Sequence, residues 1–229
     1  AAWGESPGPV MPNALPQRSK INEQPIERIA PLLEKGGRSM LLLEHHATDR
    51  AALAAASKIA SKTGCRLMTG TFPGRVDGGP GAVAVERLPY FPEQVLQTLK
   101  GVEHLIIVGG QVPASFFAYK GIPGQLVPKG CKVSRLTHIE EDSIDALQRL
   151  TERLGAQNEV IKNFEKVEIG KPSGELDTKS IIQSVAATMP ENLIVATDSG
   201  GGNAAYPYCQ NSASNTWLSL TGGAIGQGG

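Results

Sequence analysis

Apolar runs alternate with amphipathic stretches across residues 25–155. The clearest runs, 40–43 and 105–108, are apolar throughout, which is typical of strands buried on both faces of a parallel sheet. Shorter runs at 65–69 and 132–136 predict two more strands. Apolar residues at helical spacing predict helices within 25–35, 48–63, 92–99 and 142–154. This alternation predicts right-handed βαβ units and a doubly wound parallel α/β sheet of at least four strands.

Three other segments lack such a pattern. Residues 1–24 contain four prolines among small and polar residues, which predicts an extended linker. Residues 70–81 are so rich in glycine and proline that we expect no regular element there. Residues 156–175 are polar and charged, and we interpret them as a connector between two domains.

A second apolar pattern occupies residues 176–229. It predicts a helix over 176–189, with Ile181, Ile182, Val185 and Ala186 as its buried stripe, and strands at 193–196 and 217–220. Each strand passes into a glycine-rich segment, which would present bare backbone N–H groups at the carboxyl end of the strand. The spacing alone leaves open whether these glycines bind a ligand or only form turns.

The residues of these two segments carry a family resemblance. Thr197–Gly201 and Gly222–Gly226 resemble the start of the diphosphate-binding domain of thiamine-diphosphate-dependent enzymes, in the acetolactate synthase and benzoylformate decarboxylase group. The upstream residues resemble the central domain of the same family, so that the resemblance covers most of the chain. It implies a linker over 1–24, a Rossmann-like central domain over 25–155 and the N-terminal part of the cofactor domain over 176–229.

The resemblance also implies site residues and cofactors. Ser199, Gly200 and Gly201 would line the diphosphate. Gly223 would offer its carbonyl to the aminopyrimidine, and Ile225 would support the bent cofactor. The implied cofactors are thiamine diphosphate and Mg²⁺. We expect the magnesium ligands and the activating glutamate outside this sequence, no catalytic residue within it, and therefore an inactive fragment.

The implied activity is that of a 2-oxo acid enzyme, either a decarboxylase or an acetolactate-type carboligase. The implied oligomeric state is a homodimer or a homotetramer. Pro123–Gln125 and Pro128–Gly130 resemble the benzoylformate decarboxylase branch. The alternative is a non-catalytic, Rossmann-like module for nucleotide binding or assembly.

The residues that follow the strands of the central domain argue against a dinucleotide-binding site there. The first strand is followed by Glu44-His45-His46, where a pyrophosphate would require a glycine turn, and a carboxylate would repel it. Gly109-Gly110 follows a strong strand but does not begin a GxGxxG pattern. We therefore expect neither FAD nor a nicotinamide nucleotide to bind tightly.

Bulk properties narrow the remaining possibilities. The formal net charge is zero, with no basic cluster, which predicts no nucleic-acid or anionic-membrane partner. The three cysteines are far apart, without CxxC spacing, and predict reduced thiols in a cytoplasmic protein. No apolar run approaches the roughly 20 residues of a membrane span.

Isolated histidines and aromatic residues receive structural interpretations. We expect the histidines to lie at the surface or at sheet edges rather than on a metal; they are His45, His46, His104 and His138. We expect Phe116, Phe117 and Tyr119 to pack in the core or at a domain interface rather than to form a ligand cage.

Overall fold

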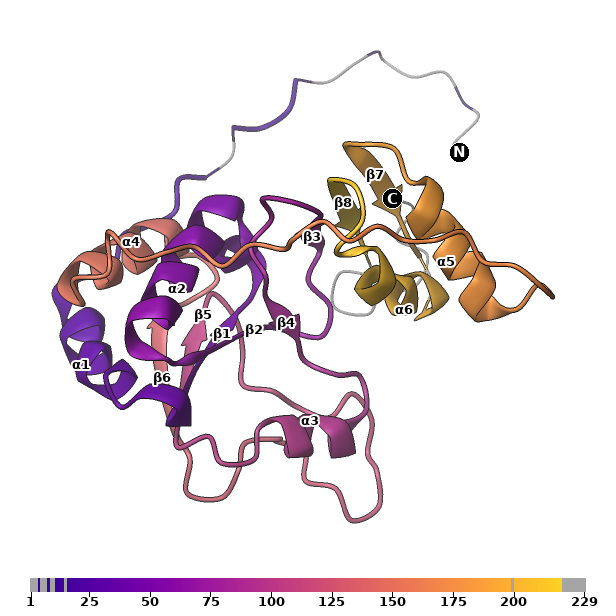
Figure 1. The fold of residues 1–229 in the computed structure, drawn as a ribbon. Coiled ribbons are helices and arrows are strands. Elements are labelled where there is room, and N and C mark those ends of the chain that lie inside the picture. The colour runs from indigo at the N-terminus through magenta and orange to yellow at the C-terminus, as the bar shows by residue number, and fades with distance from the viewer. Residues whose placement is uncertain (1–3, 5–7, 9–10, 15, 199, 220–229) are drawn as a thin grey trace.

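The computed structural model describes the chain except for residues 1–3, 5–7, 9–10, 15, 199 and 220–229. Within the described part, the centre of the molecule is a parallel sheet of five strands in the order β4-β2-β1-β5-β6 (Figure 1). Its strands are β1 (Ser39–Leu43), β2 (Arg66–Thr69), β4 (Glu86–Arg87), β5 (His104–Val108) and β6 (Lys132–Thr137). The prediction of a parallel α/β sheet is confirmed, and the short β4 adds an edge strand.

Helices cover both faces of this sheet, as a doubly wound fold requires. Every residue of β1 and β5 is buried, and alternate residues face opposite layers. Leu41 and Ile106 belong to the core formed with α1, α2 and α4, whereas Leu42 and Ile107 pack on the α3 side. The helices are α1 (Glu23–Leu33), α2 (Arg50–Thr63), α3 (Pro92–Thr98) and α4 (Ser143–Arg153), with 3-10 turns at Gly36–Arg38 and His45–Thr48.

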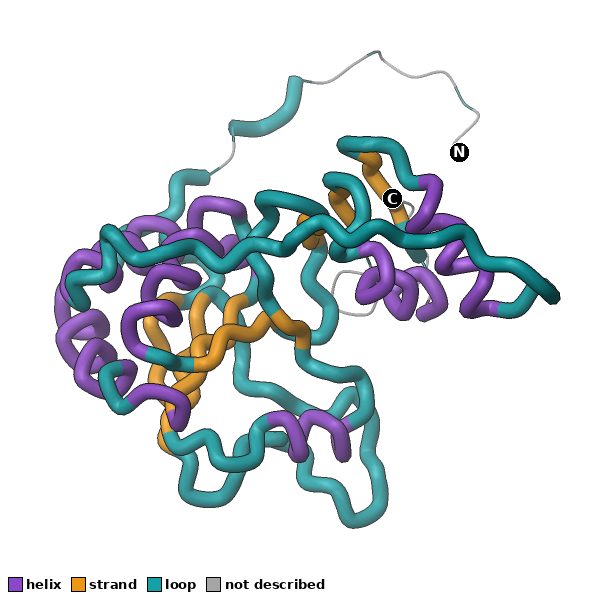
Figure 2. The backbone as a smooth tube through the Cα atoms, viewed as in Figure 1, coloured by secondary structure: helices purple, strands orange, loops and turns teal. Residues whose placement is uncertain are grey.

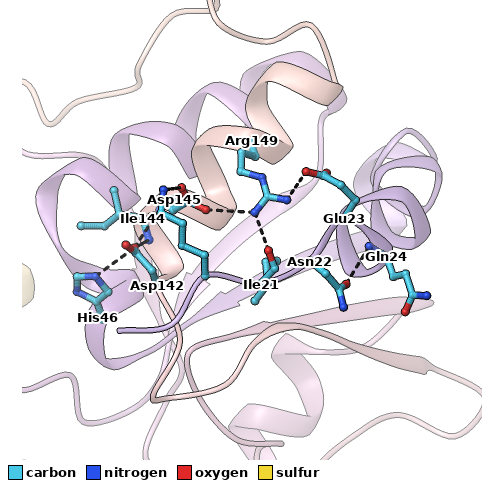
Figure 3. Close-up of polar contacts among 10 residues, drawn as sticks. Ile21, Asn22, Glu23, Gln24, His46, Asp142, Ile144, Asp145 and Arg149 are labelled. Atoms are coloured by element: carbon cyan, nitrogen blue, oxygen red, sulfur yellow. Dashed lines mark hydrogen bonds and ion pairs between the residues drawn. The ribbon is translucent and has the colours of Figure 1, made fainter. Parts of the chain in front are cut away.

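The ends of these helices follow from local chemistry. Asp142 is the N-cap of α4 and accepts hydrogen bonds from the backbone N–H groups of Ile144 and Asp145, each at 3.0 Å (Figure 3). Such a side chain satisfies donors that lack a partner within the helix. α2 ends at Gly64, whose φ of +72° lies in the left-handed region that glycine adopts without strain.

Arg149 of α4 fixes the segment that leads into α1. Its guanidinium donates to the carbonyl of Ile21 at 2.8 Å and forms ion pairs with Glu23 and Asp145 (Figure 3). Lys20 adds a second ion pair to Asp145, at 2.6 Å. The chain therefore enters the central unit along α4.

A second, smaller unit is formed around a sheet of order β3-β8-β7, counted over the described residues. β7 (Leu193–Ala196) and β8 (Asn215–Leu218) are parallel and are joined by α6 (Gly200–Cys209), and α5 (Thr178–Thr188) precedes β7. Figure 2 shows the small sheet to the right of the central one, with the long connector running across both units. This connector hydrogen-bonds first to α2, next to residues 82–84 and then to Asn211.

The expectation that residues 70–81 form no regular element is wrong. β3 (Arg75–Gly78) lies within them and pairs antiparallel with β8. Gly78 lies where a Cβ would meet the side-chain oxygen of Asn215 at 2.7 Å, so that glycine permits the close pairing. The partner strand lies about 140 residues away, and local composition could not reveal it.

Two expectations about the second unit also need correction. The glycines after β7 do not form a simple turn between strands, because Gly200–Cys209 is a helix. The expected buried stripe of α5 is wrong: only Ala186 is buried, and Ile181 and Val185 remain 48% and 43% exposed. The core of this unit includes Val76, Ala186, Met189, Tyr206, Cys209, Ala213 and Trp217.

β3 also joins the two units through Asp77. Its carboxylate accepts a hydrogen bond from the Thr216 hydroxyl at 2.8 Å and forms ion pairs with Arg50 of α2 and Arg75. Tyr206 donates its hydroxyl to the Asp77 carbonyl at 2.9 Å. One short strand therefore connects the central helices to the small sheet.

Candidate functional site

The first of the two segments that the sequence singled out, Thr197–Gly201, begins at the carboxyl edge of the small sheet, whereas Gly222–Gly226 lies outside the described residues. β7 and β8 run in parallel, with Ala196 opposite Leu218. The backbone N–H of Thr197 continues the ladder by donating to the Leu218 carbonyl at 2.9 Å. β7 and β8 therefore end side by side at this edge.

Gly200 and Gly201 are the first two residues of α6, directly at this edge. The N–H groups of the first turn of a helix have no partner within the helix, and the helix dipole makes this end positive. Without a Cβ, these two residues let an anion approach the backbone closely. The arrangement fits a phosphate group. Ser199, Gly223 and Ile225 lie outside the described residues, and their roles remain predictions.

The described residues fit only the diphosphate portion of the expected cofactor. Among them, no group of three or more His, Cys, Asp or Glu side chains is arranged to hold a metal ion. Asp198 precedes α6 and is exposed.

A second candidate site is a cavity of about 270 Å³ at the carboxyl edge of the central sheet. It opens beyond the ends of β1, β2 and β5, and its wall includes Glu44, Gly70 and Gln111. β1 is hydrogen-bonded to β2 on one side and to β5 on the other, so that the chain crosses over in opposite directions here. Open α/β sheets bind ligands at such a switch point.

Glu44 fills the position where a dinucleotide would need a glycine turn. Its Oε2 accepts the backbone N–H of Gln111 at 2.9 Å. The carboxylate lies so close to Gly70 and Gly110 that a Cβ on either would overlap its oxygens. His45 follows with φ +49°, and its Nδ1 lies 3.0 Å from the Gly109 carbonyl. The edge of the central sheet therefore carries a negative charge between two glycines.

Three aromatic rings form one wall of this cavity. Phe72, Tyr90 and Phe116 come from three separate loops, and Tyr90 and Phe116 stack with centroids 5.6 Å apart. Phe72 meets Phe116 edge-on at 5.1 Å. Phe116 and Phe117 are not core residues, since they are 46% and 60% exposed, and their packing at a domain interface stays a prediction. Both lie on the loop after β5, whose excursion from the sheet places them at the surface.

Of the histidines and cysteines, His46 lies in an ion pair, His104 lies in the core, and the cysteines are free thiols. His46 pairs with Asp49 at 2.8 Å and lies 3.6 Å from Asp142 (Figure 3). His104 begins the central strand β5, and the expectation that it lies at the surface or at a sheet edge is wrong because it is buried. All three cysteines are free thiols, and burial raises the pKa of Cys65 to about 11, so that it stays protonated at neutral pH.

Comparison with known proteins agrees with the family resemblance found in the sequence. The chain resembles thiamine-diphosphate-dependent enzymes of the acetolactate synthase large subunit and benzoylformate decarboxylase group, as its sequence indicated. It is 38% identical over 201 residues to a Mycobacterium tuberculosis protein provisionally named acetolactate synthase large subunit IlvX. This alignment covers 87% of the chain and 39% of the relative, so the chain spans well under half of that protein. No family model matches the chain.

Solved structures share the fold. An X-ray structure of a provisionally assigned thiamin diphosphate-dependent enzyme from Mycobacterium smegmatis aligns with a TM-score of 0.67 at 18% identity, over 96% of this chain and 46% of that one. Benzoylformate decarboxylase from Polynucleobacter necessarius aligns with a TM-score of 0.56 at 13% identity, over 97% and 45%. In the part of the chain that the structure describes, no helix is both long and apolar enough to cross a membrane.

Proposed function

We propose that this chain is part of a thiamine-diphosphate- and Mg²⁺-dependent enzyme that acts on a 2-oxo acid. Residues 25–155 would be its central domain, and residues 176–229 would begin the domain that binds the cofactor. The single observation that carries the proposal is the glycine-lined start of α6 at the shared carboxyl edge of β7 and β8. The similarity to IlvX supports it independently.

The residues of this chain would hold the cofactor in three places. The backbone N–H groups of Gly200 and Gly201 would bind the diphosphate, with Ser199 beside them. Gly223 would accept a hydrogen bond from the aminopyrimidine through its carbonyl, and Ile225 would support the cofactor from below. When bound, thiamine diphosphate supplies the electron sink that 2-oxo acid decarboxylation requires.

The proposal includes two possible reactions of the decarboxylated 2-oxo acid. The enzyme would either release an aldehyde, as a decarboxylase, or join the decarboxylated unit to a second carbonyl compound, as an acetolactate synthase does. The sequence similarity to IlvX favours carboligation. We place the protein in the cytoplasm as a homodimer or homotetramer. The second candidate is a non-catalytic binding module, which the cavity beside Glu44 favours.

A charge placed at the start of α6 tests the proposal. In the complete protein, Gly201→Asp adds a carboxylate beside the expected diphosphate, whereas Gly201→Asn adds a neutral side chain of the same size. An aspartate near a helix N-terminus stabilises the helix by roughly 0.3–1 kcal/mol, so loss of folding is not expected. We expect Gly201→Asp to lose thiamine diphosphate binding and turnover of pyruvate or benzoylformate, and Gly201→Asn to keep more of both.

Equal effects of the two substitutions would argue against a diphosphate at this helix. If the unsubstituted complete protein neither binds thiamine diphosphate in the presence of Mg²⁺ nor consumes either 2-oxo acid, the enzymatic proposal fails and the binding module becomes the better reading.

A further inference from the structure

The cavity at the edge of the central sheet has a chemistry opposite to that of the α6 edge. We propose that it binds a small primary amine with an apolar or aromatic body, held as an ammonium ion by Glu44. This proposal does not depend on the proposed enzymatic function, because it concerns a different sheet. It rests on the charge of the cavity wall, on open hydrogen-bonding positions and on the aromatic rings.

The first argument is charge. Among the described residues that line the cavity, Glu44 is the only Asp, Glu, Lys or Arg. No Lys or Arg forms an ion pair with it within the described part of the chain. Arg135, a cation at the same edge, is not part of the cavity wall, and its guanidinium donates to the Gly110 carbonyl and to the side-chain oxygen of Gln111. An uncompensated carboxylate in a cavity wall attracts a cation and repels a phosphate.

The second argument is hydrogen bonding. Glu44 Oε2 accepts the Gln111 N–H, whereas Oε1 accepts no hydrogen bond from the described residues. Ser115, on the loop after β5, also lines the cavity. Its hydroxyl is buried without a hydrogen-bond partner in the described structure. Buried polar atoms normally have partners. An ammonium group, with three N–H donors, can donate to Glu44 Oε1.

The third argument is the apolar wall. The stacked pair of Tyr90 and Phe116, with Phe72 against its edge, presents ring faces and edges in the same cavity as the carboxylate. Aromatic rings attract cations and also bury apolar surface. A volume of about 270 Å³ lies just below the usual range of drug-sized pockets, which favours a ligand of about ten non-hydrogen atoms.

The test uses three probes with one carbon skeleton and different charge: 2-phenylethylammonium, 2-phenylethanol and phenylacetate. Ligand-observed NMR titration of the chain measures each affinity, and ADP serves as a nucleotide competitor. We expect the ammonium probe to bind, the alcohol to bind roughly tenfold more weakly, and phenylacetate and ADP to neither bind nor compete.

Matched variants locate the site. Glu44→Gln keeps an oxygen for the Gln111 N–H and should reduce the affinity for the ammonium probe roughly tenfold or more, to that of the alcohol. Glu34→Gln, at an exposed position outside the cavity, should change nothing. Phe116→Leu should weaken ammonium binding about two- to fivefold, whereas Phe117→Leu, outside the wall, should not. Melting temperatures of all four variants check that they are folded.

Three results would each overturn the proposal. The first is that 2-phenylethylammonium does not bind the unsubstituted chain, and the second is that a folded Glu44→Gln variant binds it with unchanged affinity. The third is that ADP displaces the ammonium probe at a concentration below that of the probe. The last result would assign the cavity to a nucleotide.

Discussion

The two sheets of this chain differ in how completely they are covered. β1 and β5 are buried at every residue, between α1, α2 and α4 on one face and α3 on the other. Along β7, partly buried and exposed residues alternate, and Ile194 is 65% exposed. Parallel strands are normally covered on both faces. The two middle strands of the central sheet, β1 and β5, meet this condition, whereas β7 in the small sheet is covered on one face only.

Their carboxyl edges differ in charge as well. At the central edge, Glu44 fills the space between Gly70 and Gly110 with a carboxylate. At the edge of the small sheet, Gly200 and Gly201 begin a helix, so that backbone N–H groups are available there. One chain thus places a cation-attracting edge and an anion-attracting edge on two similar arrangements of parallel strands.

Truncating an isoleucine in each sheet compares the two sheets directly, and the truncation in the central sheet is expected to have the largest effect on stability. Ile106→Ala in β5 leaves a cavity in a fully buried core and should cost about 2–5 kcal/mol of the free energy of unfolding. Ile194→Ala in β7, at an exposed position, should change it by no more than about 0.5 kcal/mol. Urea unfolding of the chain, followed by circular dichroism, measures both. Similar losses would mean that the outer face of β7 is covered after all.

A second substitution sharpens the comparison of the edges. In the complete protein, Ile225→Ala should lower turnover on the order of a hundredfold if Ile225 positions the cofactor, because a displacement of about 1 Å can have that effect. The melting temperature should change little. If Ile225 is a core residue instead, stability should fall while the activity of each folded molecule is retained. Turnover and melting measured on one preparation separate these outcomes.

The crowding of Glu44 gives a third, intermediate effect. In Gly110→Ala, the new Cβ would lie 2.6 Å from the Cβ of Glu44, a distance that forces the chain to shift. We expect a loss of about 1–3 kcal/mol in unfolding free energy. The same substitution made in a Glu44→Gly background should cost much less. Equal losses in both backgrounds would show that Glu44 is not what excludes a side chain at residue 110.

Sequence predicted the central unit well because its signals are local. A run such as 105–108 has one stable environment, and Asp142 and Gly64 mark helix ends by their own chemistry. β3 was missed because its stability comes from β8, far away in the sequence. α6 was missed because Gly200, Gly201 and an internal Pro207 are poor helix residues that only tertiary packing can hold in a helix.

The candidate sites were predictable to different degrees. Gly200 and Gly201 could be singled out by resemblance, and Glu44 could be recognised as unsuited to a pyrophosphate. The cavity itself could not be foreseen, since Phe72, Tyr90 and Phe116 come from separate loops whose meeting depends on the whole fold. Single aromatic residues in loops carry no signal of their shared wall.

The smallest expected effect concerns Asp77, the residue that links the two units. Burial pushes the pKa of Asp77 upward, but the Thr216 hydroxyl and the two arginines, Arg50 and Arg75, outweigh it and hold the pKa below its usual 3.8. Because the pKa is lower in the folded state, the stabilisation is present above the unfolded value and is lost as the pH falls below about 3.8, through the folded value. Asp77→Asn removes the charge at every pH.

Trp217 in β8 can report this loss in the small unit. In a Trp3→Phe background it is the only remaining tryptophan. Asp77→Asn should lower the unfolding free energy seen by Trp217 fluorescence by about 1 kcal/mol or less at pH 7, since ion pairs with exposed arginines contribute little. As the pH falls below about 3.8 and through the folded pKa, the difference between the two proteins should shrink, because protonation removes the same charge from the unsubstituted chain. A difference that stays constant as the pH falls through this window would mean that Asp77 connects the units through its hydrogen bond to Thr216 and not through its charge.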